Sequence, residues 1–411
     1  MNDQASPDNR TGAAHRLYMD NAATSFPKPN AVLDAVADYA LRLGASPGRG
    51  AYRESIDSGK LIAQCRQRFN TLIHGQDPDH VVFTLNCSDA LNTAVKGVVR
   101  EGDHLITTEL DHNSILRPFH KLVADGLATQ TRVPVDPTTG EVDPDDIARA
   151  IQPRTRLIAL LHASNVTGTM QDLDAIGRVA REHDALFLVD AAQSLGHFPI
   201  DVQRSGIDLL AAPGHKGLLG PLGTGALYIR PGLDAEMNTL REGGTGSVSE
   251  LDQQPDFMPD KFEAGSHNMP GIVGLNAGLG FILQRGVENL WDHQQALIKT
   301  MLESLTEWGD MPGFHLHGPP TVRNRCGVFS VRIDGLEPAE LSNILESEYG
   351  ILTRSGLHCA PGAHRTIGSM PFGGTTRFSF GPFHSPQDVK YAADALGDIC
   401  HHAADPSLAT S

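Results

Sequence analysis

The stretch TRLIALLHASNVTGTMQDLDAIGRVAREHDALFLVDAAQS, residues 155–194, places a helical pattern between two apolar runs. The runs, 155–164 and 185–193, are rich in Leu, Ile, Val and Ala and do not alternate between apolar and polar residues. Unbroken apolar runs of this length are typical of strands buried on both faces of a mainly parallel sheet. The helical pattern at 172–183 supplies the connection between them, so the stretch predicts a right-handed β-α-β unit.

The same order of elements continues on both sides of this unit. Apolar runs at 80–85, 104–110 and 225–230 predict further strands, and the helical pattern at 88–100 lies between the first two. Such alternation predicts an α/β fold in which helices cover both faces of a mainly parallel sheet. We place this large α/β/α domain at residues 30–285.

The texture of the sequence changes after residue 285. Helical patterns at 287–309, 338–350 and 385–402 alternate with apolar runs at 327–333 and 375–381. This pattern predicts a smaller α+β domain, to which we assign residues 286–403 together with 17–29. The polar ends of the chain, 1–16 and 404–411, are expected to be disordered.

The net charge of the chain argues against two classes of partner. The 411 residues include 33 basic and 49 acidic side chains, which gives a net charge of −16. Nucleic acids and anionic lipid surfaces both attract positively charged proteins, so we expect neither as a partner. No segment reaches the ~18 apolar residues that a membrane span needs. The polar residues 1–16 do not resemble a signal peptide.

The five cysteines are scattered and form no CxxC pair; they are Cys65, Cys87, Cys326, Cys359 and Cys400. Their number and spacing favour neither a disulfide framework nor a structural zinc site. We therefore expect no metal and a location in the reducing cytoplasm.

Two residues at predicted strand ends suggest cofactor chemistry. The stretch APGHKGLLGPLGTG, residues 212–225, puts Lys216 in a Gly-rich turn after a strand-like run, and Asp190 ends the run ALFLVD. In α/β sheets, ligands bind at the carboxyl ends of the strands. Pyridoxal 5'-phosphate (PLP) needs a Lys for a Schiff base and an Asp that keeps its pyridine nitrogen protonated. On their own, the two residues favour a plainer interpretation, a surface lysine and a capping aspartate.

Other predicted strand ends carry polar groups that fit the same cofactor. Ser88 or Asp89 is placed to cap a helix whose first amides could bind a phosphate. His112 follows another strand, where its imidazole could stack on a flat ring, and Asn165 follows a third. Four strand ends thus each deliver one group suited to one cofactor. That convergence favours a PLP site over four unrelated structural roles.

The chain resembles the class V aminotransferase group of fold-type I PLP enzymes, and within it the cysteine desulfurase and selenocysteine lyase family. The matching motifs occur in the expected order over residues 17–385, which is nearly the whole chain. They are YMDNAATSFPKP, SPGRGAYRES, FTLNCSDALN, ELDHNSI, HASNVTGT, VDAAQS, GHKGLLGPLGTG, FEAGSHN, RSGLHCAP and TTRFSFGPF. The resemblance implies the fold-type I PLP-dependent transferase fold and L-cysteine as substrate, with L-selenocysteine as an alternative.

The resemblance also implies roles for the residues around the ring of PLP. Lys216 would form the Schiff base, and Asp190 would pair with the pyridine nitrogen. Gln193 would hydrogen-bond the ring oxygen. His112 would stack on the ring and assist proton transfer.

A second set of residues would hold the cofactor phosphate. Cys87, Ser88 and His215 fall at the family's phosphate-binding positions, and Ser266 would reach the phosphate of a neighbouring subunit, which implies a homodimer. The family often has two hydroxyl residues where this chain has Cys87 and Ser88, and a serine where it has Pro213. Proline offers neither a hydroxyl nor an amide hydrogen, so one phosphate contact is expected to be lost or replaced by backbone amides.

The substrate amino acid would be held by a third set of residues. The resemblance implies that Asn165 and Arg377 bind it, with Arg377 clamping its carboxylate as a bidentate fork. Arg49, Arg354 and Asn21 would lie nearby.

The stretch RSGLHCAPGAH, residues 354–364, would carry the nucleophile. It resembles a family loop with the pattern Arg-x-Gly-His-His-Cys, except that Leu357 replaces the first histidine. We expect Cys359 to lie on a mobile loop, with Arg354 and His358 favouring its thiolate. Lys216 would remove the Cα proton of L-cysteine, and the Cys359 thiolate would attack the substrate sulfur. L-alanine would leave, and a thiol or an acceptor protein would take the sulfur from the Cys359 persulfide.

Three alternatives remain at this point. An aminotransferase, an epimerase or a simple C–S lyase of the same fold would need Lys216 but not Cys359. A non-catalytic subunit of this fold would need neither. A metal site at His315 and His317, or at Cys400–His402, lacks an apparent third ligand, and we do not expect it.

Overall fold

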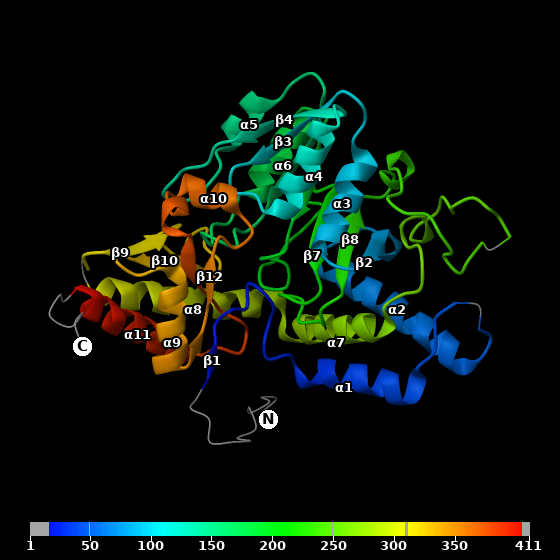
Figure 1. The fold of residues 1–411 in the computed structure, drawn as a ribbon. Coiled ribbons are helices and arrows are strands. Elements are labelled where there is room, and N and C mark those ends of the chain that lie inside the picture. The colour runs from blue at the N-terminus through cyan, green and yellow to red at the C-terminus, as the bar shows by residue number, and fades with distance from the viewer. Residues whose placement is uncertain (1–15, 49, 249, 309–310, 405–411) are drawn as a thin grey trace.

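The largest sheet has seven strands in the order β2-β8-β7-β6-β5-β3-β4 (Figure 1). Their bounds are Val81–Thr84 (β2), Asp103–Thr108 (β3), Ala128–Val133 (β4), Thr155–Leu161 (β5), Leu186–Asp190 (β6), Leu209–Pro213 (β7) and Gly225–Ile229 (β8). Neighbouring strands from β7 to β4 are parallel, and β8 alone runs against its two neighbours. The predicted mainly parallel sheet is therefore confirmed.

How deeply a strand is buried decides whether it can be predicted from the sequence. In β3, β6, β7 and β8 every residue is buried, which matches the mainly apolar composition of β6, β7 and β8; β3 also buries four polar side chains. Strand β4, with the sequence ATQTRV, was not predicted. It pairs only with β3, at the edge of the sheet, and several of its side chains are exposed. An edge strand can carry polar residues because one of its sides lacks a neighbour, so its apolar signal is weak.

Helices cover both faces of this sheet. They are α1 (Asn30–Asp38), α2 (Arg53–Leu72), α3 (Cys87–Val98), α4 (Asn113–Ala124), α5 (Pro144–Ala150), α6 (Leu173–Glu182) and α7 (Met269–Arg285). Successive strand residues point to opposite faces. Accordingly, Leu105 of β3 packs in a core with α3 and α4, whereas Ile106 packs in a second core with α2, α6 and α7. The α/β/α layering thus follows from two apolar faces of one sheet.

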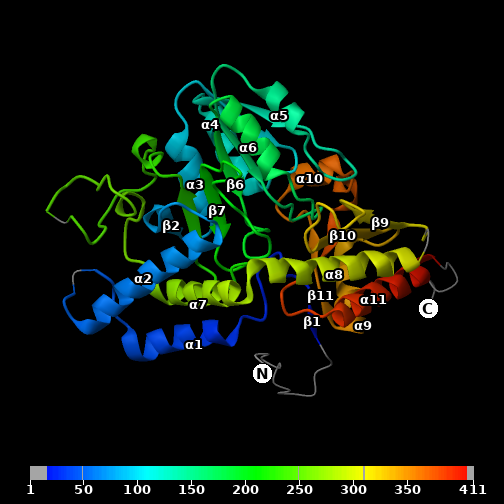
Figure 2. The same cartoon turned by 180° about the vertical axis from the view of Figure 1, so that it is seen from behind.

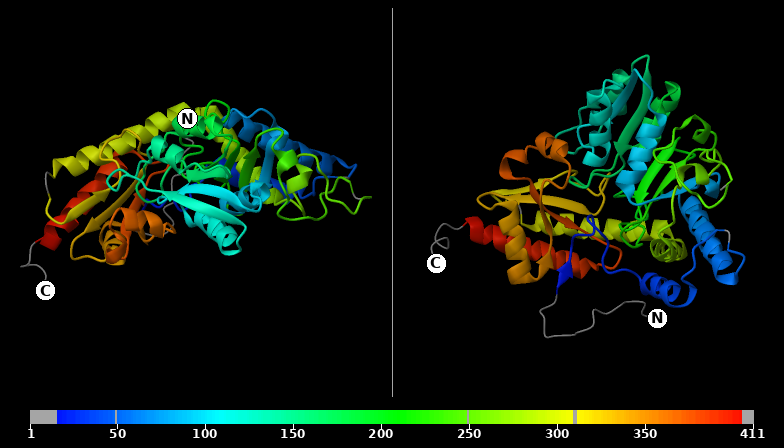
Figure 3. Two further views of the ribbon diagram at one scale, coloured as in Figure 1. Left: turned by 90° about the horizontal axis from the view of Figure 1, so that it is seen from above. Right: turned by 45° about the vertical axis from the view of Figure 1, so that its right-hand side comes forward.

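The remaining elements form two smaller sheets and three long helices. Strands β9 (Phe314–His317), β10 (Val328–Ile333), β12 (Arg354–Gly356) and β13 (Thr375–Ser379) make an antiparallel sheet, and β1 (Leu17–Tyr18) pairs with β11 (Ile351–Leu352). Their helices are α8 (Val287–Glu307), α9 (Pro338–Tyr349) and α11 (Pro386–Ala404). Helix α8 packs against α11 (Figures 2 and 3). This part of the chain encloses its own apolar core.

The segment around Cys359 is more ordered than the predicted loop. Arg354–Gly356 pairs with β13, and a short helix, α10 (Pro361–Thr366), follows, so only residues 357–360 connect the two elements. Proline at the first position favours a helix start because its missing N–H would have no partner there. Ala360 and Ala363 pack in the core of the large sheet. Cys359 therefore lies in a short connection, as expected, but the residues on both sides of it form a strand and a helix.

The computed structural model describes residues 16–48, 50–248, 250–308 and 311–404. The ends expected to be disordered, 1–16 and 404–411, lie outside the described residues apart from Arg16 and Ala404. Within those ranges, no helix combines the length and apolar character needed to cross a membrane. The domain boundaries at residues 30, 286 and 403 stay a prediction.

Candidate active site

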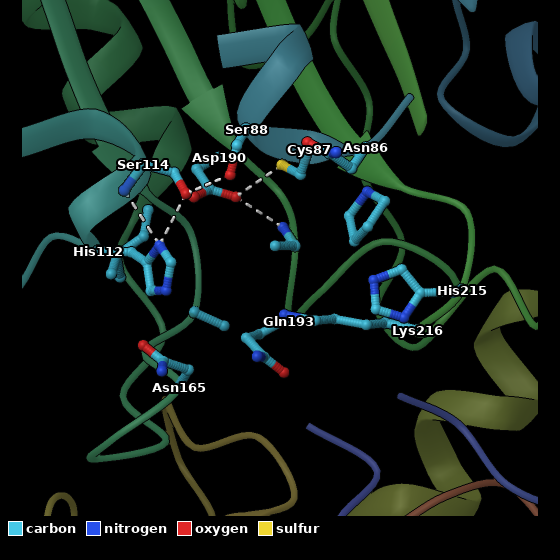
Figure 4. A pocket seen from close by; sticks show the side chains of 14 residues that line it. Asn86, Cys87, Ser88, His112, Ser114, Asn165, Asp190, Gln193, His215 and Lys216 are labelled. Carbon is cyan, nitrogen blue, oxygen red and sulfur yellow. Dashed lines mark hydrogen bonds between the residues drawn. The ribbon is translucent and has the colours of Figure 1, made fainter. Parts of the chain in front are cut away.

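A cavity with about 570 Å³ of empty space opens at the carboxyl ends of the parallel strands (Figure 4). Eight residues singled out in the sequence line it: Cys87, Ser88, His112, Asn165, Asp190, Gln193, His215 and Lys216. The fold therefore brings together side chains from strand ends that are more than a hundred residues apart in the sequence.

Lys216 lies in a tight turn after β7. The turn packs closely: a Cβ added to the neighbouring Gly217 would lie 2.2 Å from the carbonyl oxygen of Leu195. Burial lowers the pKa of the Lys216 amine below its ordinary value; the charge of Asp190 opposes this shift, and Arg377 adds to it. A lowered pKa leaves more of the amine uncharged and nucleophilic near neutral pH.

Asp190 ends β6 and is only 4% exposed. Its Oδ1 accepts hydrogen bonds from the backbone N–H of Ala192 at 2.9 Å and from the thiol of Cys87 at 3.5 Å (Figure 4). Burial, and then the charge of Asp190, raise the pKa of Cys87 well above its ordinary value, so this thiol is protonated and donates. The Oδ2 atom has no hydrogen-bond partner within the described residues, so it can accept from a protonated ring nitrogen.

The N-terminus of α3 forms another wall of the cavity. Asn86 caps the helix, since its Oδ1 accepts from the N–H of Asp89 at 3.0 Å. The expected cap at Ser88 or Asp89 is therefore wrong, and Cys87 and Ser88 are instead the first two helical residues. Their N–H groups have no acceptor within the described residues, and free amides at a helix start attract anions.

His215 completes the groups that fit a phosphate. Its Nδ1 is buried without a hydrogen-bond partner, and burial lowers the pKa of its imidazole to about 4. Pro213, the last residue of β7, lines the same cavity. An unpaired imidazole nitrogen and the two free amides of α3 supply donors that a phosphate group needs. The residues present thus fit PLP even without a hydroxyl at position 213.

His112 is held where β3 ends and α4 begins. It caps α4, because its Nδ1 accepts from the N–H of Ser114 at 3.1 Å. The preceding Asp111 is fully buried; its carboxylate accepts from the N–H groups of Thr108 and Leu161, both at 2.7 Å. These bonds tie the end of β3 to β5 and set the direction in which His112 leaves the sheet. Burial lowers the pKa of His112, and Asp190 partly opposes that shift.

Arg377 lies on β13 of the smaller antiparallel sheet and does not line the cavity itself. It is 1% exposed; its Nη2 donates to Asp20 at 2.7 Å and its Nη1 to the carbonyl oxygen of Asn165 at 3.1 Å. Its Nε is buried without a partner. Arg354 stands opposite Arg377 in the β12–β13 pair and makes no ion pair within the described residues. The pair offers donors for a carboxylate.

Two further residues of the predicted site bond to the backbone near the cavity. The amide of Gln193 donates to the carbonyl oxygen of Ala22 at 3.0 Å. The amide of Asn165 donates to the carbonyl oxygen of His358 at 2.6 Å. Asn165 thereby links the cavity directly to the segment that carries Cys359.

Cys359 is exposed and lies outside the cavity lining. Both His358 and Cys359 have positive φ angles, 48° and 59°, which non-glycine residues rarely adopt. The turn is held in place because the carbonyl oxygen of Cys359 accepts from the N–H of Asn113 at 3.0 Å. Asn113 follows His112, so the thiol is anchored close to the cavity.

His358 does not serve the thiol as expected. Its side chain is 4% exposed and its Nε2 contacts the hydroxyl of Thr375 at 3.1 Å. Burial, followed by the charge of Arg377, lowers the pKa of His358 well below its ordinary value. A neutral imidazole supplies no positive charge, so of the two residues expected to favour a thiolate only Arg354 remains charged.

Besides Cys359, Arg354 and Arg377, two further predicted residues of the described ranges, Ser266 and Asn21, do not line this cavity. Ser266 is exposed and lines a separate cavity with Arg241 and His267. The side chain of Asn21 bonds to backbone groups of Tyr18, Phe26 and Ser379. Arg49 lies outside the described residues.

Sequence reasoning missed several residues that shape the site. They are Asp20, Lys28, Asn86, Asp111 and Ser114. Asp111 and Ser114 flank His112 within the motif ELDHNSI, so their proximity was visible, but their partners on other elements were not. Lys28 donates to the carbonyl oxygen of His215 at 2.8 Å, and burial lowers the pKa of its amine to about 8.

The described residues contain no group of His, Cys, Asp or Glu side chains that could hold a metal ion. His315 is instead within 3.1 Å of Asp334, and Cys400 is buried.

Comparisons with known proteins agree with this geometry. Residues 17–392 match the family model of aminotransferase class V. A probable cysteine desulfurase of Methanothermobacter thermautotrophicus is 34% identical over 93% of this chain and 94% of its own length. A cysteine desulfurase of Salmonella agona is 32% identical over 84% of each chain.

Solved structures lead to the same group. The apo structure of a cysteine desulfurase from Thermococcus onnurineus superposes with a TM-score of 0.87 at 31% identity, over 94% of this chain and 95% of that one. A cysteine desulfurase from Escherichia coli gives 0.81 at 27% identity, over 94% of each chain. The chain therefore belongs to the class V aminotransferase family and, within it, to the PLP-dependent cysteine desulfurases.

Proposed function

We propose that this chain converts L-cysteine to L-alanine and keeps the sulfur on Cys359 for transfer to an acceptor. The observation that carries the proposal is the pairing of two features. One is the cavity that joins Lys216, Asp190 and His112. The other is the exposed Cys359, whose backbone carbonyl oxygen accepts a hydrogen bond from the N–H of Asn113, next to His112 of that cavity.

The residues that would hold PLP are those that the cavity brings together. We assign Lys216 to its aldehyde, Asp190 to its ring nitrogen and Gln193 to its ring oxygen. We assign its phosphate to the start of α3, at Cys87 and Ser88, and to His215. When bound, PLP supplies an electron sink that stabilises negative charge on the Cα of an attached amino acid.

The chain's own groups then move protons and orient the substrate. The Lys216 amine, with its lowered pKa, is suited to take the Cα proton near neutral pH. His112 lines the same cavity and is suited to assist. Arg377 and Arg354 would bind the substrate carboxylate, with Asn165 beside them; the unpaired Nε of Arg377 supports this. Asn21 and Arg49 stay predictions near the substrate.

Cys359 would act as the nucleophile toward the substrate sulfur. Its thiolate attacks that sulfur, the bond from sulfur to Cβ breaks, and the two sulfurs remain joined on Cys359. The exposure of Cys359 suits the next step, because an acceptor thiol or acceptor protein has to reach it. L-selenocysteine would enter the same site with less need for Cys359. The five free cysteines support a cytoplasmic location.

We further propose that the protein works as a homodimer in which Ser266 reaches the cofactor phosphate of the partner. Within one chain Ser266 is exposed and lies in a separate cavity, which suits a role in the neighbouring site. Sedimentation of the full-length chain is expected to give twice the mass of one chain. A monomeric chain that still binds PLP would contradict this assignment.

The function is tested by incubating the PLP-loaded chain with L-cysteine and a thiol reductant, then measuring alanine and sulfide. We expect the two products in equal amounts. L-selenocysteine serves as a comparison, and D-cysteine as the control that the oriented carboxylate site excludes. Production of pyruvate and ammonia instead of alanine would indicate a C–S lyase and contradict the proposal.

A further inference from the structure

Ser114 lies between two residues of the site and contacts both. Its Oγ is 2.6 Å from the Oγ of Ser88 and 3.0 Å from the Nδ1 of His112, while its backbone N–H donates to the same Nδ1 at 3.1 Å (Figure 4). These contacts join the start of α3 to the imidazole through one side chain. No step assigned above uses Ser114.

The backbone N–H of Ser114 sets the direction of these hydrogen bonds, because its hydrogen cannot rotate as a hydroxyl hydrogen can. A backbone N–H always donates, so the Nδ1 that accepts from Ser114 carries a lone pair and no hydrogen. To bond to Nδ1 as well, the Ser114 hydroxyl must donate and share that one lone pair, and the Ser88 hydroxyl then donates to Ser114. Ser88 consequently offers its backbone amide, rather than its hydroxyl hydrogen, to a phosphate.

We propose that Ser114 is a positioning residue that holds His112 in the neutral form with its hydrogen on Nε2. Figure 4 shows the second ring nitrogen on the side of the imidazole away from Ser114. Within the described residues Nε2 has no hydrogen-bond partner, so its N–H is free to act in the cavity that His112 lines. The use of that N–H in turnover rests on the proposed function, but the position of the hydrogen does not.

Other charges act on His112 without choosing between its nitrogens. Asp190 of β6 favours the charged ring, whereas Lys216, Arg354 of β12 and Arg117 of α4 disfavour it. The hydroxyl and the N–H of Ser114 can both donate only to an unprotonated Nδ1, because a hydrogen on Nδ1 would point at theirs. They therefore favour the neutral ring. Removing the hydroxyl should therefore raise the pKa of His112, while the backbone N–H of Ser114 keeps the hydrogen on Nε2.

The test is nitrogen NMR of the full-length chain labelled at histidine, both loaded with PLP and after PLP is removed. A His112→Gln variant identifies the His112 signals among the 19 histidines. In the wild type we expect an unprotonated Nδ1 and a hydrogen on Nε2 at neutral pH. Ser114→Ala, which keeps the backbone N–H, should raise the His112 pKa and leave the hydrogen on Nε2. Ser114→Thr, which keeps the hydroxyl, should restore the wild-type pKa, and Ser114→Cys, a weaker donor, should give a pKa between the two.

Kinetics supply a second readout. Ser114→Ala should lower kcat by roughly 3- to 10-fold, the effect of one hydrogen bond, with KM for L-cysteine nearly unchanged and the acidic limb of the pH profile moved to higher pH. A His112 pKa that is the same in wild type and Ser114→Ala would overturn the proposal, as would hydrogen on Nδ1 in the wild type. Because the NMR result does not depend on turnover, it separates failure of this inference from failure of the proposed function.

Discussion

Lys216→Ala is expected to lower kcat for alanine formation by about 10³-fold or more. Two effects combine in this variant: the covalent link to PLP is lost, and so is the amine that takes the Cα proton, a role that alone contributes roughly 10²–10⁴-fold. Alanine release from L-cysteine measures the rate. Borohydride reduction of the loaded wild type, followed by peptide mapping, identifies the lysine that holds the cofactor.

Lys28→Met is the matched control for this variant. Lys28 is a second lysine beside the same turn, and its amine also has a lowered pKa, yet it donates to the carbonyl oxygen of His215 and does not line the cavity. We expect this variant to keep PLP on Lys216 and to lose far less activity than Lys216→Ala. Labelling of Lys28 by borohydride, or an active Lys216→Ala enzyme, would contradict the assignment.

Cys359→Ala is expected to reduce sulfur transfer from L-cysteine by at least about 100-fold, since it removes the nucleophile and leaves the cavity intact. The side chain of Cys359 is exposed, so its loss leaves no cavity in the core. Binding of PLP should be unchanged. The measurement is alanine and sulfide production together with the absorbance of the bound cofactor.

Cys400→Ala is the control that tests whether removing any cysteine thiol would also reduce sulfur transfer. Burial raises the pKa of Cys400 to about 12, so its thiol stays protonated and unreactive near neutral pH. We expect this variant to release alanine at close to the wild-type rate. Equal activity of wild type and Cys359→Ala on L-cysteine would remove Cys359 from the mechanism and favour a lyase.

The sequence predicts the residues whose positions depend on strand ends. Asp190 and Lys216 each follow an apolar run, and the carboxyl ends of parallel strands meet at one edge, so their proximity follows from topology. The strand β4 escapes the same reasoning because an edge strand can replace apolar residues with Thr and Gln.

Contacts between distant side chains were beyond that reasoning. The bond from Ser88 to Ser114 joins the starts of two helices, and no sequence spacing indicates it. His358 shows the opposite error, because its place beside Cys359 suggested a charge that burial in fact removes. The cap of α3, Asn86, lies two or three residues before the predicted cap at Ser88 or Asp89.

The central claim is that sulfur from L-cysteine comes to rest on Cys359. It is tested most directly by mixing the PLP-loaded chain with one equivalent of L-cysteine labelled with heavy sulfur, without reductant, then alkylating and mapping the peptides by mass spectrometry. The account predicts one labelled sulfur atom on the Cys359 peptide for each alanine formed, and none on the peptides of the other cysteines. Alanine formed with the label absent from Cys359, or present on Cys87 instead, would contradict it.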